Sequence, residues 1–263
     1  MDFVADCSRC AGLCCVALSR SRAGGFGADA PAGTPCHHLQ ADNRCEIHSR
    51  LRQEGWPACT VFDCFGAGQQ VTQVTFAGGG WREDPDVARD MFAAFATMRH
   101  LMEMLRLLTE ARGLASGGTL HQVTGLVDEL TVLVDSPAAQ VTGSDIPALR
   151  ARVGALLSSV SEAHRSPGRS SRRLRPGAHL LGADLRGKDL SRFSLRGALL
   201  IAADLRGARM ERTDLLGADL RDARLDDADL RAAIFLTQQQ LDGAVGSSRT
   251  LLPVGLRHPE HWT

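Results

Sequence analysis

Several features that mark common functional classes are missing from this sequence. It has no Tyr and only 5% aromatic residues, so its core has to be built from Leu, Val and Ala rather than from large rings. Lys plus Arg equals Asp plus Glu at 30 each, which removes the global charge that would favour nucleic acid or an anionic membrane. No apolar run reaches the roughly 18 residues of a membrane span, and residues 1–6 do not resemble a secretory leader. These absences predict a cytoplasmic protein without a membrane partner.

Cysteine is missing after Cys64, because all eight cysteines lie between Cys7 and Cys64. Disulfides are rare in a reducing compartment, so clustered thiols there are better explained by metal ligation, whereas a secretory leader would have favoured four disulfides. Four thiolates in a tetrahedral array suit zinc or an iron–sulfur cluster. The predicted metal ligands are Cys7, Cys10, Cys14, Cys15, Cys36, Cys45, Cys59 and Cys64.

The vicinal pair Cys14 and Cys15 cannot easily direct both sulfurs at one ion. Two interpretations therefore stay open: one four-Cys site with spare buried thiols, or two sites that share this loop. Nearby histidines are alternative ligands, although a polar or supporting role is the expected one for each. These are His37, His38 and His48.

The spacing Cys-x2-Cys-x3-Cys-Cys over residues 7–15 is followed by Gly33-x-Pro35-Cys36-x2-Leu39, Cys45-Glu46-Ile47-His48 and Cys59-x4-Cys64. This pattern resembles the CxxCxxCC family of zinc- or iron-chelating domains over residues 7–64. A similar cluster occurs in flagellin lysine methylases, where it is associated with an iron–sulfur centre. The chain departs from the family by one extra residue before the vicinal pair, and by Trp56-Pro57-Ala58 where Arg-Pro is usual before the later Cys. The resemblance implies a bound metal and leaves its identity open.

Residues 83–165 are predicted to form a small helical bundle. Apolar residues recur every three or four positions from Val87 to Leu108 behind a capping Asp84 and Pro85, which predicts a helix of about 25 residues ending near Gly113. Its Met and Phe stripe is interpreted as ordinary core. Further helices are expected at 119–134 and 145–163, a short strand at 71–76, and a basic flexible linker at 166–177.

From Ala178 to Thr237 the chain repeats every five residues, in twelve units. The third residue of each unit is large and apolar, and the first is mostly Ala. Neither a helix nor a flat strand keeps such a repeat in phase, whereas a coil that turns a corner once per unit does. The third-position residues are Leu180, Leu185, Leu190, Leu195, Leu200, Leu205, Met210, Leu215, Leu220, Leu225, Leu230 and Phe235.

This pattern resembles the pentapeptide-repeat family, which implies a right-handed quadrilateral β-helix of about three coils with the third residue pointing to the axis. Lys188 and Phe193 replace the small first residue, which predicts a bulge or an outward side chain in the first coil. Thr237-x-x-Gln240 predicts a capping box that opens a short helix ending near Gly243. In the tail, 238–263, His258 and His261 are expected to pack rather than to bind metal.

The predicted chain is thus mixed α and β: a Cys-rich metal-binding region (1–82), a helical bundle (83–165), the linker, the β-helix (178–237) and a capping helix with its tail. No catalytic constellation is visible, so an enzyme is disfavoured, and the repeats balance nine Arg and one Lys against nine Asp and one Glu, which disfavours nucleic acid. The predicted function is a non-enzymatic metal-binding protein, with zinc or an iron–sulfur cluster, whose solenoid recognises another protein. There are two alternative functions: an iron–sulfur redox or modifying enzyme that positions a protein substrate on the solenoid, and a purely structural zinc knot. The chain could also form a homodimer.

Overall fold

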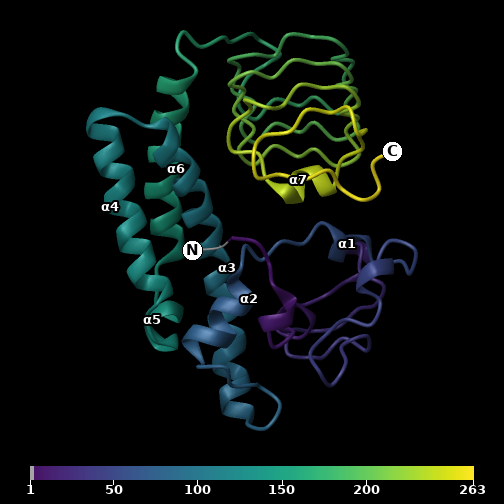
Figure 1. The fold of residues 1–263 in the computed structure, drawn as a ribbon, viewed down its shortest axis with the longest axis vertical. Helices are drawn as coiled ribbons and strands as arrows, with labels where there is room; N and C mark the ends of the chain where they lie inside the picture. Colours follow the sequence, from purple (N-terminus) through teal and green to yellow (C-terminus); the bar gives the residue numbers. More distant parts are fainter. Residues whose placement is uncertain (1–2) are drawn as a thin grey trace. The chain divides into compact units, whose positions relative to one another are not determined.

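The computed structural model describes residues 3–263. The chain divides into two compact units, with the boundary between Leu157 and Ser158. The first unit contains short helical turns, loops and long helices, whereas the second is a stack of coils (Figure 1). No helix in the described part of the chain combines the length and the apolar character needed to cross a membrane.

Short elements joined by loops make up the Cys-rich region. Two antiparallel bridges, Arg20 with Ala30 and Leu39 with Cys45, close its loops. The elements are η1 (Cys7–Arg9), η2 (Leu13–Cys15), η3 (Arg22–Gly24), η4 (His48–Arg50), α1 (Pro57–Thr60) and α2 (Ala67–Gln70), followed by the π-helical turn η5 (Val71–Thr75).

The predicted strand at 71–76 is wrong, because η5 continues α2 as a helix. Val71 and Thr72 are buried, and the Thr72 hydroxyl donates to the Gly68 carbonyl at 2.9 Å, one helical turn back. The same hydroxyl accepts from the Ala11 N–H at 3.0 Å. Burial and these local hydrogen bonds override the strand preference of β-branched residues, which is a weak and context-dependent signal.

Helices are present where the sequence predicts them in residues 83–165. Asp84 caps α3 (Pro85–Leu114) by accepting from the N–H groups of Asp86 and Val87, and the Met and Phe stripe of α3 is buried as core. Arg152 joins α6 (Ile146–His164) to Glu129 of α4 (Gly117–Val134) at 2.6 Å. A short helix that was not predicted, α5 (Ala138–Thr142), lies between α4 and α6.

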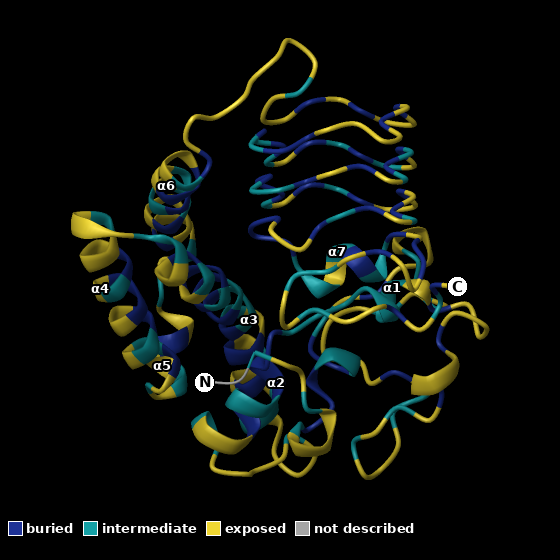
Figure 2. Ribbon diagram, turned by 45° about the horizontal axis from the view of Figure 1, so that its top comes forward, coloured by how far each residue is buried: buried dark blue, intermediate teal, exposed yellow. Residues whose placement is uncertain are grey.

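The second unit is a square coil with a period of twenty residues. Parallel bridges join residues one turn apart, such as Asp184 with Asp204 and Asp204 with Arg224. Every third-position residue of the twelve units is buried, at 4% exposure or less, and alternating buried and exposed positions run along the coils (Figure 2). Within residues 3–263 the pairing consists of single-residue bridges and no extended strand, because each side of the square is only one repeat long.

In the first ten of the twelve repeats, the corner of the coil places the fifth residue in the left-handed region, with φ between 54° and 64°. Glycine adopts this conformation without strain, whereas Ala202 and Arg212 adopt it with a Cβ. At the irregular first positions, Lys188 is exposed as expected, whereas Phe193 is only 5% exposed. The Arg169 guanidinium lies 4.7 Å from the Phe193 ring centre and covers it.

Both ends of the coil extend beyond residues 178–237. Arg169, in the segment predicted as a linker, pairs with Phe193 above the first coil, and Asp229 pairs with Leu251 below the last. The predicted capping box is present at the start of α7 (Gln238–Asp242). Trp262 packs against the coil core.

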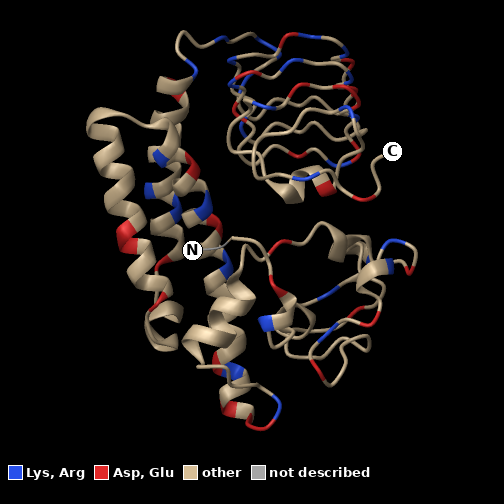
Figure 3. Cartoon of the chain, in the orientation of Figure 1, with Lys and Arg blue, Asp and Glu red and all other residues tan. Residues whose placement is uncertain are grey.

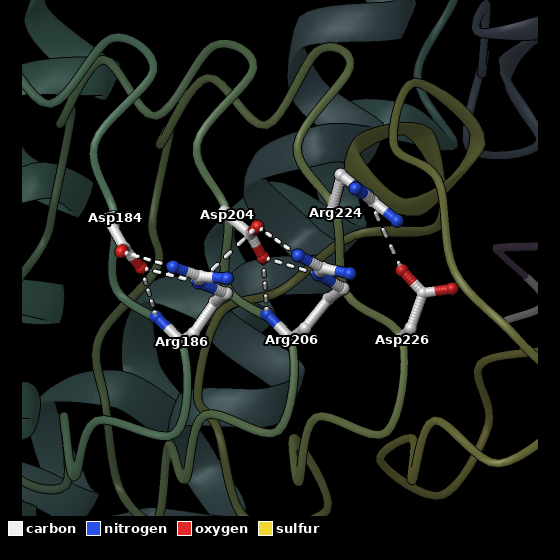
Figure 4. Close-up of polar contacts among 6 residues, drawn as sticks. All are labelled: Asp184, Arg186, Asp204, Arg206, Arg224 and Asp226. Atoms are coloured by element: carbon white, nitrogen blue, oxygen red, sulfur yellow. Dashed lines mark hydrogen bonds and ion pairs between the residues drawn. The ribbon is translucent and has the colours of Figure 1, made fainter.

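Acidic and basic residues are interspersed over the coils (Figure 3). On one face Asp184 pairs with Arg186 at 2.7 Å and Asp204 with Arg206 at 2.6 Å, while Arg186 also reaches Asp204 at 3.8 Å (Figure 4). These hydrogen bonds lower the pKa of both carboxyls. The positive and negative charges of these side chains therefore largely cancel on this face.

Candidate metal centre

All eight predicted ligands are free thiols in the first unit. Cys7 lies on η1, Cys14 and Cys15 on η2, and Cys59 on α1, and the others lie in loops. Gly12 precedes η2 with φ 70°, and a Cβ there would meet the Leu39 side chain at 2.7 Å, so the chain turns tightly into the vicinal pair only because this residue is Gly.

Four of the thiols surround one small apolar cluster built on Trp56. Cys36 is buried in that cluster with Ile47 and Leu51, and Cys15, Cys45 and Cys59 pack against it. The Cys36 N–H donates to the Cys15 carbonyl at 2.8 Å, which ties the two loops together. We call Cys15, Cys36, Cys45 and Cys59 the Trp56 group.

The other four thiols lie around Gly68. A Cβ on Gly68 would meet the Cys10 sulfur at 2.6 Å and the Cys64 sulfur at 3.9 Å, so both sulfurs lie against the bare face of α2. η1, which carries Cys7, packs on α2. The half-buried Cys14 contacts Cys15, and the charges of Cys10 and Cys7 also act on it. We call Cys7, Cys10, Cys14 and Cys64 the Gly68 group.

Loss of hydration and mutual repulsion favour the neutral form of these thiols except Cys15, whose pKa is lowered by its hydrogen bond with Cys14. Loss of hydration raises the pKa of Cys7 to about 11, with further contributions from Cys10, Cys64 and Cys15. It raises the pKa of Cys59 to about 12, with further contributions from the other three members of the Trp56 group. A bound cation reverses this balance, because it ligates thiolates and displaces their protons.

Backbone N–H groups point at four of the sulfurs and favour the thiolate. They lower the pKa of each thiol against the larger effect of burial. N–H donors of this kind stabilise metal-bound thiolates. The donors are Gly12 and Leu13 for Cys10, His38 for Cys36, Ile47 for Cys45, and Gly66 and Gly68 for Cys64. This donor set fits a soft metal bound by thiolates.

Two arginines place positive charge near the thiols, and no sequence motif predicts that they lie there. Arg20 is buried, and its guanidinium donates to the Cys15 carbonyl at 2.8 Å and to the Thr34 carbonyl at 2.7 Å. Burial lowers the pKa of Arg99 on α3, and the charges of Glu103, Cys64 and Cys14 oppose that shift.

The sulfurs of each group lie in the same part of the unit, but they do not converge on one point. Among residues 3–263, no three His, Cys, Asp or Glu side chains converge in a geometry that would hold a metal ion. The Cys14 and Cys15 sulfurs are 3.8 Å apart. Neutral thiols form only weak hydrogen bonds, such as the contact between Cys14 and Cys15, so a metal held by four sulfurs would have to draw the members of a group closer together.

The histidines serve other contacts. His38 pairs with Glu46 at 2.7 Å, and His37 stacks on His38 with ring centres 3.9 Å apart. His258 hydrogen-bonds to the Thr250 carbonyl and His261 to the Ala244 carbonyl, each at 2.8 Å. His48 is exposed.

Comparison with known proteins gives a family match for the solenoid and a relative for nearly the whole chain. A family model described as pentapeptide repeats matches residues 178–215 and 198–235. The uncharacterized protein YybG of Bacillus subtilis (strain 168) is 42% identical over 265 residues, covering 99% of this chain and 95% of YybG. The chain belongs to the YybG family.

This member of the YybG family joins a Cys-rich N-terminal part to a pentapeptide-repeat solenoid. A solved structure, the pentapeptide repeat protein alr5209 from Nostoc PCC 7120, is 34% identical and covers 38% of this chain and 87% of its own, with a TM-score of 0.25. The resemblance of residues 7–64 to CxxCxxCC domains stays a prediction.

Proposed function

We propose that this protein is a non-enzymatic metal-binding scaffold, in which residues 7–64 bind zinc or an iron–sulfur cluster and the solenoid binds another protein. The observation that carries the proposal is the gathering of eight free thiols in one unit, with N–H donors aimed at four of the sulfurs. Thiolates of this kind select zinc or iron–sulfur clusters over hard cations.

The small core of the Cys-rich region supports a structural use of the metal. The apolar cluster at Trp56 contains four buried residues, and the large apolar side chains buried elsewhere in the region are few, among them Leu13, Val16 and Phe65, which is little for a region of this size to fold alone. Metal ligation supplies the missing folding energy in small domains of this kind. The thiols are therefore expected to stabilise the region as well as to bind the metal.

The solenoid is suited to binding rather than to chemistry. Its Asp and Arg side chains pair within single repeats, and Arg186 also reaches Asp204 on the next coil, which leaves no unpaired carboxylate pair for acid–base catalysis on the face shown in Figure 4. Rigid repeat surfaces commonly recognise proteins. Sedimentation over a range of concentrations distinguishes a second copy of this chain from a different partner protein.

The test is the metal content of the purified full chain, prepared with and without oxygen. The proposal expects stoichiometric metal in at least the anaerobic sample. A visible band bleached by dithionite would identify an iron–sulfur cluster and would favour the redox or modifying enzyme, whereas a colourless protein with zinc would favour the scaffold. A chain without stoichiometric metal under both conditions would overturn the proposal.

A further inference from the structure

We propose that the eight cysteines form two separate four-thiolate sites, the Gly68 group holding one metal and the Trp56 group holding the other. The inference rests on the proposed function, because it presupposes thiolate ligation. It assigns the vicinal Cys14 and Cys15 to different sites. Each site would take one zinc ion or one iron–sulfur cluster.

The geometry of η2 separates the vicinal pair. Consecutive residues of a 3₁₀-helix leave its axis about 120° apart, so Cys14 and Cys15 start in different directions. Their sulfurs are 3.8 Å apart, a spacing that two ligands of one zinc ion could also have, so the distance alone does not show whether they share a site. We therefore assign each residue to a site by the residues around it.

Cys15 belongs with the Trp56 group. It packs against the same apolar cluster as Cys45 and Cys59, and its carbonyl accepts the Cys36 N–H. No member of the Gly68 group is among the residues of that cluster. Cys14 instead follows Gly12 and Leu13, whose N–H groups point at Cys10.

Each group also has its own arginine. Arg20 lies beside the Trp56 group, with its guanidinium on the Cys15 carbonyl, and its charge acts on Cys15, Cys36 and Cys59. Arg99 lies by the Gly68 group, where Cys64 and Cys14 act on its charge. Four thiolates around a divalent ion carry a net charge of about −2, and two such sites side by side repel each other. A cation at each site reduces that repulsion.

Both groups contain thiols that receive backbone N–H donors: Cys10 and Cys64 in the Gly68 group, and Cys36 and Cys45 in the Trp56 group. The partition itself rests on the packing and on the two arginines. Four soft ligands in each group match the complete shell of a structural zinc site.

Paired substitutions in the full chain, loaded with zinc under reducing and anaerobic conditions, test the partition by native mass spectrometry. The unaltered chain should bind two zinc ions. Cys10→Ser with Cys64→Ser should retain one, and so should Cys36→Ser with Cys59→Ser. Cys10→Ser with Cys59→Ser, which breaks both groups, should retain none.

A second measurement avoids variants that fail to fold. The unaltered chain is given less than one equivalent of zinc, alkylated, and mapped for protected thiols. Protection should occur in the two sets of four, and protection of a set that mixes the groups would overturn the inference. One tight zinc per chain would overturn the two-site inference while leaving the proposed function intact, whereas no bound metal, zinc added or native, would overturn both.

Discussion

The two parts of this molecule are stabilised in different ways. In the solenoid, each repeat places one large apolar side chain on the axis, and hydrogen bonds join the coils, as between the Leu200 N–H and the Asp219 carbonyl at 2.9 Å. In the Cys-rich region, the cluster around Trp56 is small and the thiols stay apart. A repeated apolar position builds a core without a ligand, whereas the proposed function assigns part of the stability of the loop-rich region to a bound ion.

The largest expected effect of a single side chain is on the solenoid axis. Leu205→Ala should lower the free energy of unfolding of the second unit by about 2–5 kcal/mol, because it leaves a cavity where Leu205 is fully buried. Leu181→Ala is the control, since Leu181 is 58% exposed and its loss should cost less than about 0.5 kcal/mol. Chemical denaturation followed by circular dichroism measures both. Equal effects would show that the ladder does not form the core.

The next effect belongs to the Cys-rich region. Gly68→Ala should weaken zinc binding at the Gly68 group by about 10- to 100-fold, because the added methyl would press on the Cys10 sulfur at 2.6 Å. The affinity of the Trp56 group should not change. Competition with a chromophoric chelator measures both affinities. Gly125→Ala, on α4 with open space around it, is the matched control, and an equal loss there would contradict the assignment.

The metal-free protein should become less stable in alkali. The folded state keeps the protons of Cys7 and Cys59, whose pKa values rise from 9.0 to about 11 and about 12, while the unfolded chain loses them above about pH 8.5. The unfolded state then binds fewer protons, so the free energy of unfolding falls between about pH 9 and pH 12. Denaturation at several pH values, with a reductant present, checks this. The metal-loaded protein, whose thiols are already deprotonated, should lack this fall, and an equal fall there would contradict the explanation.

The smallest effect is at a corner of the solenoid. Ala202→Gly should raise the free energy of unfolding by about 0.5–1 kcal/mol, because Ala202 has φ 54° and Gly adopts that angle without strain. Ala203→Gly, at the buried position next to it, should instead be destabilising. Thermal unfolding of the two variants checks the pair. The same sign for both would contradict the strain argument.

The same contrast explains what the sequence could predict. The solenoid was predictable because five residues determine where each side chain points, so Leu180 and Phe235 occupy equivalent places without any information about distant contacts. The spacing of the thiols predicts metal ligands, but it does not predict the division proposed here, because that division depends on how aperiodic loops bring Cys36 to Cys15. Arg20 and Arg99 carry no local signal at all. The strand expected at 71–76 failed because local preference lost to the helix that precedes it.

Hydrogen exchange of the full chain, with and without a strong chelator under reducing conditions, tests the contrast most directly. Removal of the metal should lower the protection of backbone amides within residues 7–64 and leave residues 178–237 unchanged. Equal protection of residues 7–64 with and without the metal would contradict the account, because the ion would then add nothing to the stability of that region.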